Sequence, residues 1–272
     1  MPADLHIHTT SSDGSSTPED IVRMAESFGL EALAITDHDT LDGIAPAQRA
    51  GHTNGIEILP GIELGAYCQG EEIHILGYLV EMENHAFLEK LALLLKTRIQ
   101  RMERMVEKLQ GLGFPVDMDM VADISGTGSV GRPHLAAALI NIGAVETVSE
   151  AFEKYIGTGR PAFLPRYKMN PIEAVALIKS AGGAPVLAHP GLNKANYPLG
   201  DLIRAGLVGI EAYHPAHSPE QACAFQILAS KNSLIATGGS DYHGQDRKEG
   251  YKFGMVTVPY SVIGELKKKA GR

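Results

Sequence analysis

The chain has 272 residues, of which 44% are hydrophobic and 21% are charged, as is typical of a soluble globular protein with one large domain or one domain carrying an insertion. Its formal net charge of −8 argues against binding to long duplex nucleic acid, because such binding favours basic surfaces. Cys68 and Cys223 form no CxxC pair, which excludes a zinc finger, and no apolar run approaches the length of a membrane span.

Short apolar runs alternate with helix-period segments at the start of the chain, which is the pattern of an α/β fold. The first strand, DLHI, is followed by a helix that begins at Thr17, where a hydroxyl cap precedes a proline and two acidic residues. A second helix is expected from Asp39 to about Gly51. The strands predicted in this part of the chain are 4–7, 31–36, 56–64 and 72–80.

The alternation stops after the fourth strand, and residues 84–155 contain almost no strand signal. LEKLALLLKTRIQRMERMVEKLQGLG predicts a long amphipathic helix, and its basic residues are interleaved with glutamates, which favours packing over nucleic-acid binding. Shorter helices are expected at 117–123, 131–142 and 147–156. The sequence therefore predicts an all-helical insertion at 84–155 within a domain made of 1–83 and 156–272.

Strand and helix alternate again in the last third of the chain, from a helix at 171–181 to a last helix near 261–270. The strands predicted here are 184–188, 207–213 and 234–238. Seven strands in βα units favour a TIM-like (β/α)7 barrel with one strand fewer than the usual eight. A doubly wound open sheet is the alternative, but no GxGxxG or Walker loop follows any strand.

Side chains that can bind a metal lie on or just after every predicted strand. His6 and His8 end the first strand, and the period of two points both to the same side. The others are Asp37, His38, Glu63, His74, His189, Glu211, His214, Asp241 and His243. Most of them fall at C-terminal strand ends, which form the catalytic face of a barrel.

Imidazole and carboxylate ligands suit zinc, manganese, iron or cobalt, and the absence of cysteine ligands disfavours a structural zinc site. The candidates are too many for a single ion, and Glu63 is the natural bridge between two. Clusters of two or three divalent ions serve phosphoryl transfer, because they activate water and stabilise the attacking and leaving oxygens.

Six segments resemble, in order, the motifs of the PHP (polymerase and histidinol phosphatase) family of metal-dependent phosphoesterases. They are DLHIHTTSSDGS, ITDHDTLDG, PGIEL, HILGY, AHPG and GGSDYHG. The resemblance covers nearly the whole chain. It implies a distorted seven-stranded barrel that carries the catalytic site, in agreement with the strand count, and a helical insertion that caps the substrate.

Carried over position by position, the resemblance implies two or three bound divalent ions, with manganese, zinc or iron as candidates. One ion would bind His6, His8, Glu63 and Asp241, a second would share Glu63 and add His74 and His189, and a third would bind Asp13, His38 and His243. The candidate catalytic residues among these are Glu63, Asp241 and His189. Three further carboxylates look like partners that orient histidine rings, namely Asp4, Asp37 and Asp39.

Within the family, the helical insertion and SVGRPHLAAAL (129–139) resemble the branch that removes phosphate from nucleoside 3′,5′-bisphosphates, some members of which trim short RNA from the 5′ end. The resemblance implies that Arg132 and His134 bind a substrate phosphate, which an arginine can grip with two hydrogen bonds. The alternative is that Arg132-Pro133 only begins a helix. His217 in EAYHPAHS is a further candidate for substrate binding at the pocket rim.

The sequence thus predicts a metal-dependent phosphatase or phosphodiesterase in which a hydroxide bridging two ions attacks phosphorus in line. The expected substrate is a small phosphorylated metabolite, first of all a nucleoside 3′,5′-bisphosphate that yields the monophosphate. A 5′-3′ exoribonuclease of short oligonucleotides, a histidinol-phosphatase-like enzyme and a noncatalytic metal-binding accessory domain are the alternatives.

Two further expectations concern the phosphate contacts and the location of the protein. LPRYK supplies Arg166 and Lys168, which either contact a second phosphate or face solvent. MPADLHIH lacks the pattern of a signal peptide, so we expect a cytoplasmic protein without membrane partners.

Overall fold

The computed structural model describes residues 2–126, 130–165, 169–193, 197–244 and 250–272. The chain divides into two units, each with its own core. Unit 1 comprises Met1–Glu89 and Met169–Arg272, and unit 2 comprises Lys90–Lys168. Within the described ranges, no helix combines the length and the apolar character that a membrane crossing requires.

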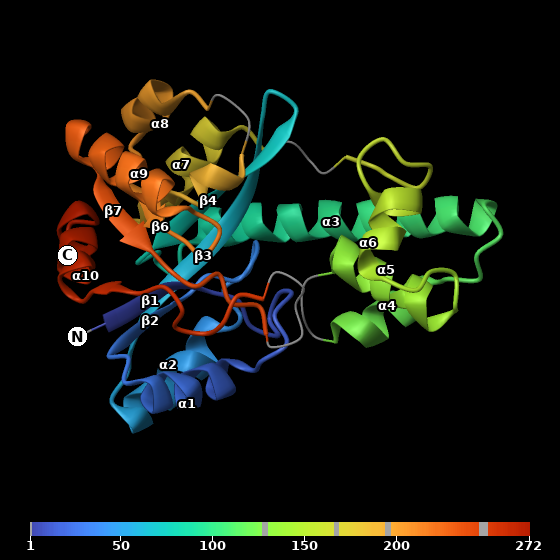
Figure 1. Ribbon diagram of the computed structural model, residues 1–272, viewed down its shortest axis with the longest axis horizontal. Helices are drawn as coiled ribbons and strands as arrows, with labels where there is room; N and C mark the ends of the chain where they lie inside the picture. The colour runs from blue at the N-terminus through green and yellow to red at the C-terminus, as the bar shows by residue number, and fades with distance from the viewer. Residues whose placement is uncertain (1, 127–129, 166–168, 194–196, 245–249) are drawn as a thin grey trace. The chain divides into compact units, whose positions relative to one another are not determined.

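A single sheet forms the framework of unit 1 (Figure 1). Its strands are β1 (Pro2–Ile7), β2 (Ala32–Ile35), β3 (Glu57–Cys68), β4 (Glu71–Tyr78), β5 (Ala184–Leu187), β6 (Gly209–Tyr213), β7 (Ile235–Gly238) and β8 (Val258–Pro259). The strand order is β7-β6-β5-β4-β3-β2-β1-β8. β1 to β3 pair in parallel, as do β5 to β7, whereas β4 is antiparallel to both of its neighbours and β8 is antiparallel to β1.

The sheet curls into a nearly closed barrel because the chain after β7 returns to β1. Ile7 forms a parallel bridge with Tyr242, and the His8 N–H donates to the Tyr242 carbonyl at 3.0 Å. The predicted α/β barrel fold is confirmed, with all seven predicted strands present. The additional strand β8 has only two residues, too few for an apolar pattern to reveal it.

The antiparallel pairing of β3 and β4 departs from a regular (β/α) barrel, and the connection between the two strands explains it. Only Gln69 and Gly70 separate them, and both have positive φ, at 51° and 90°. Two such residues make a tight hairpin turn whose twist matches that of the strands. No crossover helix is present at this point, so the strands must run in opposite directions.

Helices line the sheet of unit 1, α1 and α2 beside β1 to β3 and α7, α8 and α9 on the side of β4 to β7 (Figure 1). Their bounds are α1 (Pro18–Phe28), α2 (Ile44–Asn54), α7 (Pro171–Ser180), α8 (Leu199–Ala205), α9 (Pro219–Lys231) and α10 (Ser261–Lys269), with a 3-10 turn at Pro190–Leu192. α1 begins as predicted, since the Thr17 hydroxyl accepts the Asp20 N–H. α2 begins later than predicted, because Asp39 has a positive φ of 56° and the polar segment before Ile44 forms a loop.

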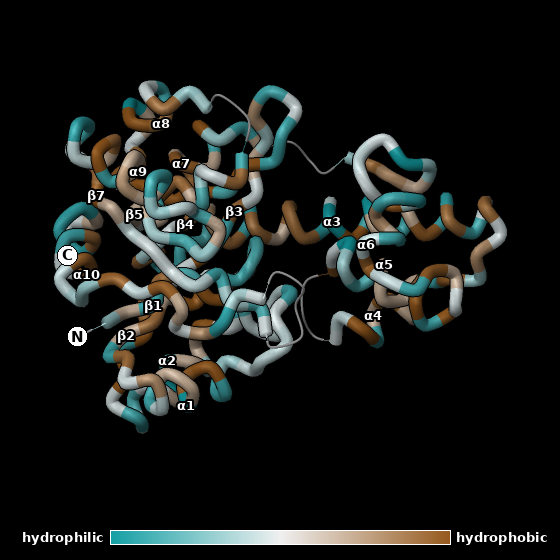
Figure 2. Tube along the Cα trace, viewed as in Figure 1, coloured by the Kyte–Doolittle hydropathy of each residue, from teal (hydrophilic) through white to brown (hydrophobic). Residues whose placement is uncertain are grey.

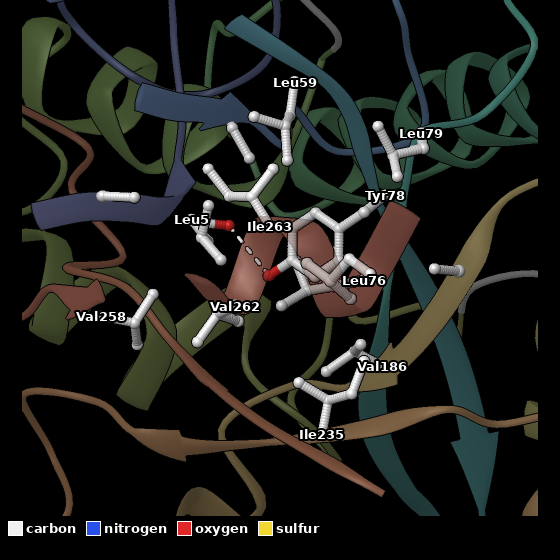
Figure 3. Close-up of a cluster of buried hydrophobic side chains, with 14 of the residues drawn as sticks. Leu5, Leu59, Leu76, Tyr78, Leu79, Val186, Ile235, Val258, Val262 and Ile263 are labelled. Atoms are coloured by element: carbon white, nitrogen blue, oxygen red, sulfur yellow. Dashed lines mark hydrogen bonds between the residues drawn. The ribbon is translucent and has the colours of Figure 1, made fainter. Parts of the chain in front are cut away.

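The interior of the barrel is apolar, and α10 covers part of it (Figure 3). Leu5, Leu76 and Val186 from three strands pack with Val262 and Ile263 of α10. The Tyr78 hydroxyl, at the centre of this cluster, donates to the Leu5 carbonyl at 2.9 Å. A second cluster fills the layer between the sheet and α1 and α2. The two clusters hold the strand ends in place.

Unit 2 is helical, as expected for the insertion. α3 (His85–Gly111) begins in unit 1 and continues into unit 2, followed by α4 (Met118–Ser125), α5 (Arg132–Asn141), α6 (Val148–Ala151) and a π-helical turn at Phe152–Ile156. Apolar and polar residues alternate along α3 (Figure 2), and its apolar face joins α4 to α6 in a separate core that includes Met105, Val121 and Leu139.

Candidate metal centre

The structure brings together all nine residues predicted as metal ligands, and all of them belong to unit 1. They form four overlapping groups of side chains whose ligand atoms lie within 4.8 Å of one another. The groups are His8, Asp13, His38 and His243; His6, His189 and Asp241; His6, His8 and Glu63; and His38, Glu63 and His74. The overlaps make one continuous centre at the strand ends. Which ion each residue binds stays a prediction.

Glu63 lies in the middle of this centre, on β3, and is 1% exposed. Its Oε1 is 2.8 Å from His74 Nδ1 and 3.1 Å from His189 Nε2. Its Oε2 is 3.1 Å from His8 Nε2 and 3.2 Å from His38 Nδ1. Because each oxygen faces different imidazoles, this carboxylate could be shared by two ions.

Asp241 completes the group around the first strand. Its Oδ1 lies 3.2 Å from His6 Nε2 and 3.3 Å from His8 Nε2, and these two ring nitrogens are 3.2 Å apart. The same-side placement of His6 and His8 that period two predicted is therefore observed. Two ring nitrogens and a carboxylate oxygen at this spacing suit a divalent cation.

Asp13 reaches the centre from the loop after β1. Its Oδ1 is 3.6 Å from His8 Nδ1 and 3.4 Å from His243 Nε2, and the rings of His8 and His243 stack with centroids 4.0 Å apart. The segment DLHIHTTSSDGS therefore contributes His6 and Asp13, which belong to different ligand groups.

The backbone at the centre is unusual at two ligand positions and at one glycine. His189 and Asp241 have positive φ values of 22° and 50°, which L-residues rarely adopt and which are common at functional sites. A Cβ on Gly239 would lie 2.5 Å from the Cβ of His6. The second glycine of GGSDYH therefore allows the end of β7 to pack directly against β1.

The electrostatics of the centre favour bound cations. Burial alone would raise the pKa of Glu63, but His74, His38 and His6 hold it well below its usual range, so the carboxylate is ionised. Burial would lower the pKa of His8 and of His74, but nearby carboxylates raise each to about 10. Burial lowers the pKa of His38 to about 3. Without metal the centre binds protons, which a divalent cation would displace.

The donor atoms provide a direct test of whether divalent ions fit. Buried polar atoms normally form a hydrogen bond, yet the Nδ1 atoms of His8, His38, His74 and His189 are buried and form none, although those of His38 and His74 lie 3.2 and 2.8 Å from Glu63 oxygens. All four of these nitrogens belong to rings that face Glu63. Cations coordinated by imidazole and carboxylate would satisfy such atoms, so the residues present fit divalent ions.

Known proteins with similar sequences place the chain in a family. The PHP domain model matches residues 4–116. The phosphoribosyl 1,2-cyclic phosphate 1,2-diphosphodiesterase of Eggerthella lenta is 34% identical over 263 residues, 94% of this chain and 97% of that protein. The chain belongs to the PHP family. Another relative is the 5′-3′ exoribonuclease Rnm of Escherichia coli K12, which is 33% identical over 251 residues, 88% of this chain and 84% of that protein. A third is the 3′,5′-nucleoside bisphosphate phosphatase of Chromobacterium violaceum, which is 31% identical over 250 residues, 88% of this chain and 86% of that protein.

A solved structure agrees with this assignment. A candidate metal-dependent phosphoesterase from Bifidobacterium adolescentis superimposes with a TM-score of 0.89 at 32% identity, over 99% of this chain and 98% of that one. The predicted PHP resemblance and the predicted enzyme class are confirmed. This PHP protein is a phosphoric ester hydrolase, so the alternative of a noncatalytic accessory domain is not retained.

The residues predicted to bind substrate lie outside the nine-residue centre. Arg132 and His134 open α5 of unit 2, where the Gly131 N–H donates to His134 Nδ1 at 3.1 Å. The expectation that this segment begins a helix is therefore fulfilled. The Arg132 guanidinium carbon lies 5.1 Å from the centre of the Phe152 ring and 5.8 Å from that of Phe163. Arg166 and Lys168 lie outside the described residues.

His217, the third predicted substrate contact, has a structural role instead. Its Nδ1–H donates to the Ala212 carbonyl at 2.9 Å, and its Nε2 accepts the Gly191 N–H at 3.1 Å. Both ring nitrogens are used by the backbone, so these bonds leave no donor for a phosphate. His217 connects the loops that follow β5 and β6.

Two of the three carboxylates expected to orient histidine rings have other hydrogen-bond partners. Asp37 accepts the Thr9 N–H and the Ser12 hydroxyl, and Asp4 accepts backbone N–H groups that include Ser240, so both hold loops rather than rings. A buried carboxylate that does contact a ligand ring is Glu211, at 2.9 Å from His6 Nδ1. Its position on the sixth predicted strand was the sequence signal that placed it among the possible metal-binding side chains.

Proposed function

We propose that the protein hydrolyses one phosphate ester of a sugar that carries a second phosphate. The first candidate substrate is a nucleoside 3′,5′-bisphosphate, which would yield the nucleoside monophosphate and inorganic phosphate. The observation that carries the proposal is Glu63, a buried carboxylate with ring nitrogens of four histidines within 3.2 Å of its oxygens.

The nine-residue centre would hold the metal ions, with Glu63 shared between them. Bound divalent ions would supply Lewis acidity, which activates water and neutralises charge on the phosphoryl oxygens. The chain's own contribution is to fix the ligands: buried strand ends carry them, and backbone hydrogen bonds such as His8 N–H to Tyr242 hold those ends together. The water-poor surroundings of Glu63 strengthen each charge interaction there.

The named substrates of two relatives support a second phosphate as part of the recognised group. One relative is named for a nucleoside bisphosphate and another for a phosphoribosyl cyclic phosphate, and each of these compounds carries two phosphoryl groups on one sugar. A site that recognises such compounds needs hydrogen-bond donors, charged or neutral, for the phosphate that is not cleaved. We assign this role to Arg132 and His134.

The local structure around Arg132 is compatible with that role. Two phenyl rings lie beside the guanidinium, which limits the number of conformations and leaves less entropy to lose on binding. In His134, Nδ1 accepts a backbone N–H, so the proton of the neutral ring is on Nε2, where it can be donated to a phosphate oxygen.

Two substitutions and two substrates test the proposal. Glu63→Gln should lower the turnover of a nucleoside 3′,5′-bisphosphate and of a simple aryl phosphate by about 100-fold or more, because it disrupts the shared ligand. Arg132→Ala should lower kcat/KM for the bisphosphate by about 10- to 100-fold, the value of a charge-assisted hydrogen bond, and leave the aryl phosphate unaffected. His52→Ala and Arg104→Ala, at exposed positions, are the matched controls.

Steady-state kinetics with metal-loaded protein separates the outcomes. Wild-type rates in Glu63→Gln would contradict the metal centre. Equal losses on both substrates in Arg132→Ala would contradict the second-phosphate role and leave the metal centre intact.

A 5′-3′ exoribonuclease activity on short RNA is the second candidate, favoured by the similarity to Rnm over 88% of this chain. The net charge of −8 disfavours long polymers more than short ones. Turnover of 5′-phosphorylated oligonucleotides of two to twelve residues, beside the bisphosphate, distinguishes the two: a rate that rises with chain length would favour the nuclease.

A further inference from the structure

Two buried side chains of the β6 region contact the metal ligands without belonging to any of the four ligand groups. Glu211 lies on β6 and His214 directly follows this strand, and they are 0% and 3% exposed. Every other strand from β1 to β7 carries one of the nine ligand residues or is followed by one within three residues. β6 therefore differs from its neighbours, because its two buried residues contact the ligands but belong to no ligand group.

Glu211 holds two ligands at once. Its Oε1 is 2.9 Å from His6 Nδ1, and its Oε2 accepts the His189 N–H at 2.7 Å. An ionised carboxylate only accepts hydrogen bonds, so the Nδ1 of His6 carries a proton. The lone pair of a neutral His6 ring is then on Nε2, the atom that faces Glu63 and Asp241. Glu211 thereby selects the tautomer that metal binding requires.

His214 acts on Asp241 by the same logic. Its Nδ1 accepts the Ala216 N–H at 3.1 Å, so in the neutral ring the proton is on Nε2. This Nε2 lies 3.2 Å from Asp241 Oδ2. A nitrogen that bears a proton donates and cannot coordinate a cation. His214 thus holds one oxygen of Asp241, and the other oxygen faces His6 and His8.

We infer that Glu211 and His214 are positioning residues, whose hydrogen bonds fix the orientation of metal ligands. Glu211 would fix His6 of β1 and His189 after β5, and His214 would fix Asp241 after β7. The inference rests on the metal centre of the proposed function. The pair joins three points of the barrel that are far apart in sequence: Glu211 lies 205 residues from His6 and 22 from His189, and His214 lies 27 from Asp241. Partners of this kind typically contribute 10- to 100-fold to metal affinity.

Metal binding to three variants tests the inference, with Co²⁺ alone as the probe and a competing chelator to measure affinity. Glu211→Gln offers one acceptor where two N–H groups need one each, and His214→Phe keeps the ring and removes the donor. Both should weaken Co²⁺ binding by about 10- to 100-fold and change its visible absorption. His214→Gln retains an N–H donor and should bind Co²⁺ nearly as tightly as the wild type.

Controls separate positioning from general damage. Glu57→Gln removes a carboxylate on β3 that pairs with Lys267, and His52→Phe changes an exposed ring on α2, so both should retain wild-type Co²⁺ affinity. The thermal midpoint of the metal-free protein is measured for each variant, because a role in folding alone would lower this midpoint and leave the Co²⁺ affinity of the folded protein unchanged.

The possible outcomes are distinct. Wild-type Co²⁺ affinity in Glu211→Gln and His214→Phe would overturn the inference, as would equally weak binding by His214→Gln and His214→Phe. If His214→Phe does not fold, Glu211→Gln decides by the same criterion. A wild-type protein that does not bind Co²⁺ would instead refute the metal centre and the proposed function together with this inference.

Discussion

Glu63 and His217 are polar side chains near strand ends, yet their surroundings give them different roles. The oxygens of Glu63 face ring nitrogens of histidines, an arrangement that attracts cations. The nitrogens of His217 face a backbone carbonyl and a backbone N–H, an arrangement that ties two loops together. Residue type and position along a strand do not distinguish these cases, because the partners come from distant parts of the chain.

The role of His217 predicts a pH dependence of stability. Burial, followed by the neighbouring His214 and His189, lowers the pKa of His217 below 6.5, although Ala212 and Glu211 act in the opposite direction. When the pH falls below about 6.5, His217 takes up a proton in the unfolded chain but not in the folded one. The free energy of unfolding therefore decreases as the pH falls, until the pKa of folded His217 is reached. Its full contribution is present above pH 6.5.

His217→Gln should weaken that dependence, because an amide can accept from Gly191 and donate to Ala212 without titrating. Urea unfolding of the metal-free protein at pH 7.5 and pH 5.5 gives the comparison: the wild type should lose more stability between the two pH values than the variant. Identical losses in both proteins would refute the assignment.

At the level of elements, the strands and helices of unit 1 follow largely from local pattern. Buried strands are short apolar runs, and caps such as Thr17 define helix starts, so seven strands and the major helices could be predicted. The hairpin between β3 and β4 was missed because Gln69 is an unusual residue for a positive φ. β3 also extends to Cys68, beyond the predicted end, because it pairs with β4 over its whole second half.

The candidate ligands were predictable in part for the same reason, since all but Asp13 lie on or shortly after a strand that its own sequence reveals, and the resemblance to the PHP family implied the set of nine. The ring nitrogen that each histidine presents was not, because it depends on partners such as Glu211, 205 residues from His6. Nor was the positive φ of Asp241, which lies two residues after the close approach of Gly239 to His6.

The close contact of β7 with β1 predicts the effect of one methyl group. Gly239→Ala places a Cβ within 2.5 Å of the His6 Cβ and 2.9 Å of Asp4 Oδ1, so the strand ends must separate. Overpacking of this kind costs about 1–3 kcal/mol of stability, and we also expect weaker metal binding because His6 is displaced. Urea unfolding and a Co²⁺ titration measure the two effects.

Gly264→Ala is the matched control, since nothing lies within 4 Å of the added carbon and the residue is helical. It should be neutral or slightly stabilising. A Gly239→Ala protein as stable as this control would show that the end of β7 can shift without cost.

At the level of the whole molecule, the two units have separate hydrophobic cores, and the candidate metal centre found among the described residues lies in unit 1. The unit 2 core draws on α3 to α6, whereas all nine candidate ligands belong to unit 1. A ligand stabilises the unit that binds it, by about 2.7 kcal/mol at a concentration of 100 times Kd.

Differential scanning calorimetry should therefore resolve two transitions with different responses. Removal of metal by a chelator should lower the midpoint of the unit 1 transition alone, and restored metal should reverse the change. Leu139→Ala, a fully buried position in unit 2, should lower the other midpoint through a loss of about 2–5 kcal/mol. A single transition that moves with both perturbations would mean that the units unfold together.

The bridge between Ile7 and Tyr242 has a consequence for the order of events during synthesis. Ligands near residue 6 emerge from the ribosome long before Asp241 and His243, and contacts between such distant residues form slowly because the intervening chain must first be ordered. A nascent chain that lacks β7 holds only part of the coordination sphere. We expect the complete set of ligands to assemble only when the barrel closes, so the rate at which refolding protein reaches its full metal content should report on that final step.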